Sequence, residues 1–282
     1  MKRTLLFTAM MLLVCSIQNL NAQIATVFND NFETSAGTFY AIASGPIGTS
    51  STWSLSRSGT DFGAGINAGR MVLGNDGSSA GNFAGWALGY TNTANFLTPY
   101  NTTLNANPGD VTWTFNMRQP QANPGGFTFG TYGVAFILAG TSGTTNSTGT
   151  GYAVTLGNSG TTGPLRLVRY SAGLQTSTTI ITSNTSGLTD FGNAYLSVKV
   201  IYTPSTNTWK LYVRNDGTAF LDPNSGSLTL QGSPTVNNTS TGTVLPIMGG
   251  FWNAYTAANQ AAYMDNGKVT RAFPTGFSLT PP

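Results

Sequence analysis

The segment AYLSVKVIYTPSTNTWKLYVRN, residues 194–215, decides the fold class of this chain. Apolar residues hold every second position from Leu196 to Tyr202 and again from Trp209 to Val213, with mostly polar residues between them. This period of two, carried by β-branched and aromatic residues, predicts two strands with one buried face each. The connection TPSTN contains a proline that presets φ and an asparagine that tolerates left-handed backbone. The segment is therefore predicted to be a β-hairpin, which needs further strands and a second layer to bury its apolar face.

Other short segments of similar character are predicted to supply those strands. They lie at residues 26–33, 52–57, 70–74, 85–91, 111–117, 132–139, 151–156, 165–170, 175–182, 219–221, 228–230, 246–252 and 261–271. Residues 132–139 are uniformly apolar, which indicates a strand covered on both faces. Residues 36–51 are predicted to be a loop and residues 231–242 a flexible stretch, and no window shows the spacing of an amphipathic helix. The pattern favours one all-β sandwich with very little helix.

The N-terminus has the character of an export signal. Lys2 and Arg3 precede an apolar run at residues 5–17, which is too short to span a bilayer comfortably. Ala22 offers a small residue for cleavage, so Gln23 is expected to begin the mature protein. An uncleaved anchor is the alternative, which the lack of a stop-transfer pattern disfavours. The protein is therefore expected to be secreted, either into the medium or to the outer cell surface.

The expected domain organisation is simple. Residues 1–22 form the signal peptide, and residues 23–272 form one sandwich domain without an interior linker. Residues 273–282 contain three prolines and are predicted to be a linker-like tail, at which a longer natural protein would continue.

Composition excludes several classes of function. Cys15 is the only cysteine and lies in the predicted signal, where the preceding Val14 disfavours lipid attachment. A mature chain without cysteine has no disulfides and no thiol chemistry. Only 7% of residues are charged and the formal net charge is +3, which falls to +1 when Lys2 and Arg3 are removed. Nucleic-acid binding needs clustered basic residues, which are missing. A neutral, polar surface suits a neutral glycan or another surface protein.

Several segments resemble the concanavalin A-like, laminin-G-like jelly-roll domains of exported bacterial surface proteins, which are often cargo of type IX secretion. These segments are GYAVTLG, PLRLVRYSAG, the hairpin above, and MGGFWNAYTAANQAAYMDN. The opening NDNFE and the closing YMDNGKV are similar to the first and last strands of that family. The resemblance implies a two-layer antiparallel jelly-roll sandwich in which those two strands pair. It does not fix the function, because the superfamily contains lectins, glycosidases and structural modules.

Catalysis is not expected. Glycan-cleaving members of this superfamily carry paired glutamates on one strand, as the two-carboxylate chemistry requires. This chain has one glutamate, Glu33, and no histidine, which also removes Ser-His-Asp catalysis and the usual zinc sites. A lyase remains as an alternative if a tyrosine and several basic residues meet on one face, although alternating charges on a solvated strand explain them better. Those residues are Tyr152, Arg166, Arg169, Tyr170 and Lys199.

Aromatic residues provide the remaining signal for a ligand. A flat aromatic ring stacks on the C–H face of a sugar while neighbouring amides bind its hydroxyls. The predicted ligand-binding residues are Trp86, Tyr90, Trp252, Asn253 and Tyr255. The competing interpretation places the strand tryptophans, Trp252 among them, in the sandwich core.

Calcium is the one metal expected as a possible structural cofactor, because it accepts oxygen ligands including backbone carbonyls. Asp76 and Asp265 are the candidate ligands.

The sequence thus predicts a secreted, non-catalytic module that recognises carbohydrate or a cell-surface component. A structural or adhesive protein without a small ligand is the alternative, in which residues 178–181 form an edge for self-association. A glycan-active hydrolase or lyase ranks last.

Overall fold

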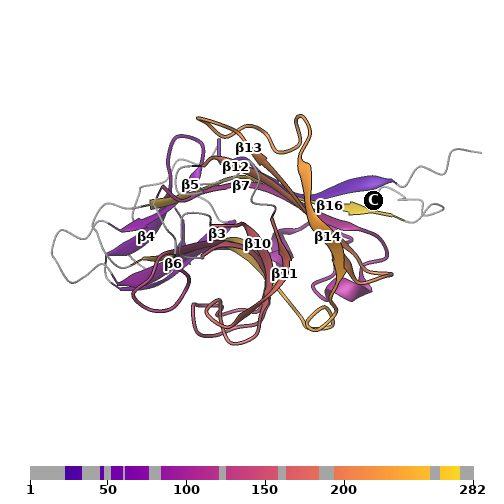
Figure 1. Cartoon of the computed structure of the whole chain (residues 1–282), viewed down its shortest axis with the longest axis horizontal. Helices are drawn as coiled ribbons and strands as arrows, with labels where there is room; N and C mark the ends of the chain where they lie inside the picture. The colour runs from indigo at the N-terminus through magenta and orange to yellow at the C-terminus, as the bar shows by residue number, and fades with distance from the viewer. Residues whose placement is uncertain are drawn as a thin grey trace, which may run out of the picture.

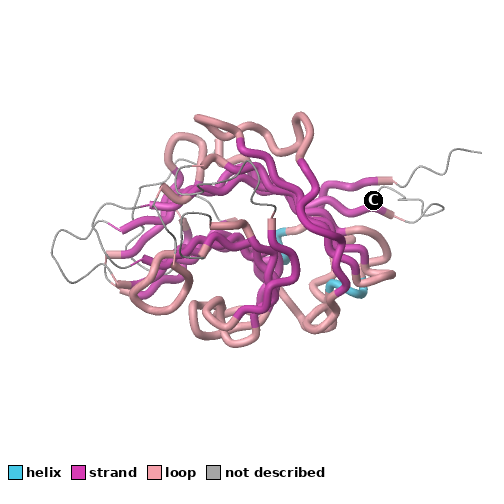
Figure 2. Tube along the Cα trace, in the orientation of Figure 1, coloured by secondary structure: helices cyan, strands magenta, loops and turns pink. Residues whose placement is uncertain are grey.

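The computed structural model describes residues 23–33, 45–47, 52–59, 61–75, 84–120, 125–157, 163–183, 194–254 and 261–273. Within these ranges the chain forms two stacked antiparallel sheets (Figure 1). Helix is confined there to two single 3-10 turns, η1 (Thr93–Asn95) and η2 (Leu104–Ala106), drawn cyan in Figure 2. The described residues contain no helix long and apolar enough to cross a membrane.

Eight strands form each sheet. Sheet A contains β1 (Ile24–Asp30), β4 (Phe62–Ile66), β5 (Met71–Asn75), β7 (Val111–Arg118), β12 (Leu196–Thr203), β13 (Thr208–Asn215), β14 (Thr229–Val236) and β16 (Ala261–Ala272). Sheet B contains β2 (Gly45–Pro46), β3 (Trp53–Ser58), β6 (Gly85–Asn92), β8 (Gly133–Gly140), β9 (Gly151–Leu156), β10 (Arg166–Tyr170), β11 (Ser177–Thr182) and β15 (Ile247–Ala254).

The strand order is that of a jelly roll. Sheet A runs β14-β13-β12-β7-β16-β5-β4 with β1 beside β16, and sheet B runs β11-β10-β9-β8-β15-β6-β3-β2. The chain changes sheet repeatedly, for example from β14 in sheet A to β15 in sheet B and back to β16. The first and last strands pair antiparallel, with Asp30 opposite Gly267. The expected two-layer antiparallel sandwich is therefore confirmed.

The hairpin at residues 194–215 forms as predicted. Strands β12 and β13 pair in continuous register from Leu196 opposite Asn215 to Thr203 opposite Thr208. Asn207 in the connection has φ of 52°, the left-handed backbone for which asparagine is well suited. Strand β7 lies on the other side of β12, so the hairpin is part of a wide sheet.

The main core lies between the two sheets, where the inward faces of their strands meet. Phe115 of β7 stacks on Phe136 of β8 across the layers, with ring centroids 3.8 Å apart. Trp113 and Trp209 stack at 6.1 Å, and both are fully buried. Each such aromatic side chain stabilises the sandwich by roughly 2–3 kcal/mol through burial alone.

The structure differs from the sequence prediction at four places. Residues 231–236, predicted to be flexible, belong to β14, whose outward side chains lack an alternating apolar pattern because β14 is the edge strand of sheet A. Residues 219–221 form no strand. Strand β4, with the sequence FGAGI, and the short β2 were not predicted, because small residues in β4 hide its alternation.

A loop after β13 is fastened to the outer face of sheet A by a buried ion pair. Arg214 Nε donates to Asp216 Oδ1 at 2.6 Å, and the Asp216 side chain is fully buried. Asp216 Oδ2 also accepts hydrogen bonds from Ser197 Oγ at 2.7 Å and from Leu221 N at 3.0 Å. The Asp216 carboxylate therefore anchors this loop to sheet A.

The predicted domain ends are partly described. The predicted signal, residues 1–22, and residues 274–282 lie outside the described ranges. Phe273, which the sequence boundary assigned to the tail, is buried, and its N–H donates to Gln23 O at 2.8 Å. The sandwich therefore includes Phe273.

Candidate functional site

Sheet B turns one face to the core and the other outward, and the register places outward side chains in rows across the strands. One row contains Ser56, Leu88, Phe251, Ala135, Thr155 and Arg166, on β3, β6, β15, β8, β9 and β10. The neighbouring row contains Ser54, Tyr90, Gly249, Ile137, Ala153, Val168 and Thr179. We call this surface the outer face of sheet B. It is apolar in the middle and polar at both ends.

A second, smaller hydrophobic cluster, the outer cluster, covers the middle of this face. Its buried members are Leu88, Phe127, Ala135, Ile137, Ala153, Val168, Tyr170, Leu174, Ile247 and Phe251. Phe127 comes from the loop before β8, and Leu174 comes from the loop after β10. Both loops lie on the outer side of sheet B, which is its lower side in Figure 1. Trp86 and Tyr90 of β6 are half-buried at the margin of the cluster. Binding surface is therefore left at the two ends of the face.

At the β6 end lies a hollow of about 180 Å³, which we call the tyrosine hollow. It is lined by Ser56, Leu88, Tyr90, Asn92, Ser142, Gly143 and Ile247. One half-buried aromatic ring, two hydroxyls and a side-chain amide thus converge on a small space with an apolar floor. This is the composition of a site for a neutral, hydroxyl-rich ligand.

At the β10 end lies a second hollow of about 210 Å³, which we call the arginine hollow. Its lining is mostly polar and consists of Gly125, Gly126, Phe127, Thr128, Thr155, Gly157, Arg166, Val168, Leu174, Gln175, Ser177 and Thr179. Arg166 is the charged residue of this lining, and its Nε is buried without a hydrogen-bond partner. The hollow therefore combines one cation with several neutral donors and acceptors.

The outer face of sheet B carries no carboxylate on any of its described strands. Glu33 lies against Gly69, in the turn between β4 and β5 of sheet A. Tyr170 in the outer cluster is buried with its hydroxyl 3.2 Å from Thr144 Oγ1, and burial raises the pKa of this phenol. The phenol therefore stays protonated at neutral pH. This face offers binding groups without a carboxylate acid or base.

The basic and tyrosine residues considered for a lyase do not share one face, so that grouping is wrong. Arg166 and Tyr170 point outward from sheet B, whereas Tyr152 belongs to the main core and Arg169 is its register partner. Tyr152 Oη donates a hydrogen bond to Asn237 Oδ1 at 3.0 Å and accepts one from Ser240 N at 3.0 Å. Burial raises the pKa of Tyr152 to about 12. Lys199 lies in sheet A, over the ring of Tyr212.

Two of the predicted ligand-binding residues are structural, which corrects the sequence prediction. Trp252 is fully buried in the main core, with its ring 5.5 Å from that of Phe62. Asn253 is buried, and its Nδ2 donates to Thr128 O at 3.1 Å and Thr131 O at 2.7 Å. Asn253 thus holds the loop that carries Phe127. Among the other predicted site residues, Trp86 and Tyr90 lie at the outer face, and Tyr255 lies outside the described residues.

The predicted calcium ligands do not make up a site within the described ranges. Asp265 lies beside the irregularity in β16, where its Oδ1 accepts from Asn266 N at 2.6 Å. Burial raises the pKa of Asp265 to about 7. In the part of the chain that is described, no group of three or more His, Cys, Asp or Glu residues is placed to hold a metal ion. Asp76 lies outside that part, so a calcium site remains a prediction.

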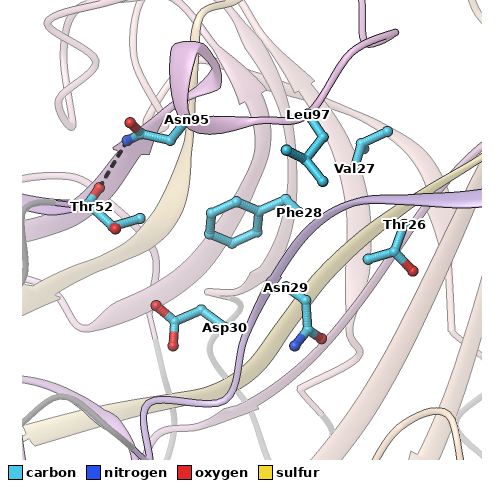
Figure 3. A pocket seen from close by; sticks show the side chains of 8 residues that line it. All are labelled: Thr26, Val27, Phe28, Asn29, Asp30, Thr52, Asn95 and Leu97. Atoms are coloured by element: carbon cyan, nitrogen blue, oxygen red, sulfur yellow. Dashed lines mark hydrogen bonds between the residues drawn. The ribbon is translucent and has the colours of Figure 1, made fainter. Parts of the chain in front are cut away.

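A larger hollow of about 440 Å³ lies beside the edge of β1 (Figure 3). Side chains of β1 meet there with Thr52, which precedes β3, Asn95 of η1 and Leu97. Some of its polar groups already bond to other parts of the protein. Asp30 Oδ2 accepts from Trp53 Nε1 at 2.8 Å, and Asn95 Nδ2 donates to Thr52 O at 3.3 Å. This hollow therefore has fewer unengaged polar groups to recognise a ligand than the outer face of sheet B.

Sequence reasoning missed several residues of the outer face. Ser56, Asn92 and Ser142 enter the tyrosine hollow from three separate segments, and only the strand register brings them together. Phe129 is 67% exposed in the loop that Asn253 holds. The alternation of serines at positions 54, 56 and 58 in β3 was the one local signal that this strand has a polar outward face.

Comparison with known proteins finds several solved structures that are similar to this chain over most of its length. Peanut lectin bound to a nine-residue peptide is similar over 89% of this chain and 98% of that chain, with 14% identity and a TM-score of 0.47. Basic winged bean lectin with Tn-antigen is similar over 89% and 100%, with 16% identity and a TM-score of 0.47. The potassium-bound carbohydrate recognition domain of Emp46p is similar over 78% and 88%, with 14% identity and a TM-score of 0.45. No family model and no curated protein matches the sequence.

Proposed function

We propose that this chain is a secreted, non-catalytic module that binds carbohydrate on the outer face of sheet B. The observation that carries the proposal is the tyrosine hollow, in which the half-buried ring of Tyr90 meets the polar side chains of Ser56, Asn92 and Ser142. Carbohydrates present apolar C–H faces and a rim of hydroxyls. A site with one aromatic wall and several neutral polar groups matches both features.

The non-catalytic part of the proposal is supported by the placement of acidic residues. Hydrolysis of a glycosidic bond uses two carboxyl groups about 5–10 Å apart. The described strands of sheet B carry no Asp or Glu, and Glu33 belongs to the sheet A side of the molecule. Bound glycan is therefore expected to leave chemically unchanged.

Binding would be tested with the chain from Gln23 to Pro282 on a broad glycan array, with and without calcium, followed by variants. Tyr90→Ala is expected to lower the affinity for the best glycan about tenfold or more, because stacking and the hollow are both lost. Tyr212→Ala is the matched control, since Tyr212 is a half-buried tyrosine on the opposite sheet. Silence across the array, or equal losses in both variants, would refute the proposal.

A structural or adhesive role is the second candidate, and the edges of the sheets favour it. Strand β11, which contains residues 178–181, does lie at the edge of sheet B, and β14 lies at the edge of sheet A beside it (Figure 1). Val236 of β14 is 67% exposed. An exposed strand edge is a template for pairing with another chain. Sedimentation that shows a monomer at every concentration would exclude this role.

A further inference from the structure

We propose that the arginine hollow binds an acidic group of the glycan, either a uronate carboxylate or a sulfate ester. This inference rests on the proposed carbohydrate function, because it assigns a chemical class to part of the ligand. The arginine hollow and the tyrosine hollow lie at opposite ends of the outer face of sheet B. The two ends are joined by the row that starts at Ser56 and ends at Arg166.

Arg166 is positioned rigidly by the sheet. It is the first residue of β10 and pairs with Thr155 of β9 on one side and Thr182 of β11 on the other. The outward direction of its side chain is fixed by this register, because its neighbour Leu167 belongs to the main core. A guanidinium whose strand is paired on both sides is preorganised, so little further ordering is needed when a ligand binds.

No acidic side chain among the described residues neutralises the charge of Arg166. Among the described residues Arg166 forms no ion pair, whereas Arg214 of sheet A is paired with Asp216. The lining of the arginine hollow contains no acidic side chain, and Arg166 Nε is buried without a hydrogen-bond partner. A buried donor without a partner costs free energy that a ligand atom can recover.

The neutral groups around Arg166 suit an oxyanion on a sugar. Thr155, Ser177 and Thr179 present hydroxyls in the same hollow, and Gln175 presents an amide. Guanidinium matches the two oxygens of a carboxylate or sulfate in a fork geometry, while the hydroxyls and the amide remain for the sugar hydroxyls. A purely neutral ligand would leave the cation without a counter-charge.

The test compares three oligosaccharide probes by calorimetric titration of the whole mature chain. Oligogalacturonate carries carboxylates, its fully methyl-esterified form is neutral on the same backbone, and a carrageenan oligosaccharide carries sulfate without carboxylate. The variants are Arg166→Gln, Arg166→Lys and, as a control with the same change of net charge, Lys210→Gln on sheet A. Thermal unfolding of each variant checks that the fold is retained.

We expect an acidic probe to bind at least about tenfold more tightly than the neutral one, and the acidic probe that does so identifies the carboxylate or the sulfate. Arg166→Gln should abolish this preference, Arg166→Lys should keep part of it, and Lys210→Gln should leave it unchanged. Equal affinities for acidic and neutral probes would overturn the inference and leave the proposed function standing. An acidic preference that Lys210→Gln removes equally would also overturn it. Binding of none of the probes, together with a silent glycan array, would refute both.

Discussion

The indole ring of Trp86 stacks on the phenyl ring of Phe251, with ring centroids 5.7 Å apart and planes inclined by 22°. Phe251 in turn contacts Phe127 at 6.0 Å between centroids, so the three aromatic rings tie β6, β15 and the loop before β8 together. One side of the indole therefore completes the outer cluster, and its half-buried state leaves the rest available to a ligand. The stability of the outer cluster and the proposed ligand surface of sheet B therefore depend on the same side chain.

Two replacements of Trp86 measure how much its ring stabilises the outer cluster. Trp86→Ala removes the stack on Phe251 and should lower the free energy of unfolding by about 2 kcal/mol, less than for a fully buried tryptophan. Trp86→Phe keeps an aromatic contact and should cost less than about 1 kcal/mol. Urea denaturation of the two variants measures the difference. Equal losses in both would show that the stack on Phe251 does not stabilise the sandwich.

The ion pair between Arg214 and Asp216 should be worth more than any exposed charge of the chain. Asp216→Ala leaves the Arg214 guanidinium and the Ser197 hydroxyl without their shared acceptor, so we expect a loss of about 3 kcal/mol in the free energy of unfolding. Asp222→Ala is the control, since Asp222 accepts from Asn224 N at 2.8 Å in an exposed turn, and its loss should stay under about 1 kcal/mol. Similar denaturation midpoints for the two variants would contradict the assignment.

The side chain of Asn253 is expected to control the loop at residues 128–131. Asn253→Ala removes both hydrogen bonds to Thr128 O and Thr131 O, which should lower the free energy of unfolding by about 1–3 kcal/mol. Amide hydrogen exchange should rise in residues 127–132 with little change in the hairpin of β12 and β13. Unchanged exchange in this loop would mean that other contacts hold it.

The raised pKa of Asp265 should make the free energy of unfolding depend on pH. Its pKa is raised by burial from 3.8 to about 7, against the opposing effect of the hydrogen bond from Asn266 N. As pH rises from about 4 to about 7, the unfolded chain loses this proton while the folded chain retains it, so the contribution of Asp265 to stability falls across that window. Asp265→Asn cannot ionise and should gain stability relative to the native chain at the upper end of the window. Urea denaturation curves at both ends test this, and a constant difference between the two proteins would contradict it.

The fold was predictable because its deciding signals are local. The alternation in residues 194–215 and the turn at Asn207 can be recognised from neighbouring residues alone. The structure forms the predicted hairpin with this turn. Strand β4 was not predicted because its glycines and alanine give no alternation of apolar and polar residues, although its five residues are all buried. Only the start of β14 was predicted, as the strand at residues 228–230, since an edge strand with one exposed side needs no apolar pattern along its length.

The site was only partly predictable because it depends on which face of a buried strand points outward. In β15 all eight residues are buried, so the sequence does not distinguish Trp252, which points to the core, from Phe251, which points to the outer cluster. Trp86 and Tyr90, which were predicted to bind a ligand, lie at the outer face, and their role in binding stays a prediction. Arg166 and Ser56 end one row that crosses six strands, and this relationship exists only in the register of sheet B.

The most direct test of the account is a hydrogen-exchange footprint of the whole mature chain with and without its best glycan from the array. A binding site on sheet B should add protection in residues 54–58, 86–92 and 141–145, which surround the tyrosine hollow, and cause no change beside β1. Protection confined to residues 26–30 and 95–97, or to the outer face of sheet A, would contradict the claim that sheet B carries the binding site.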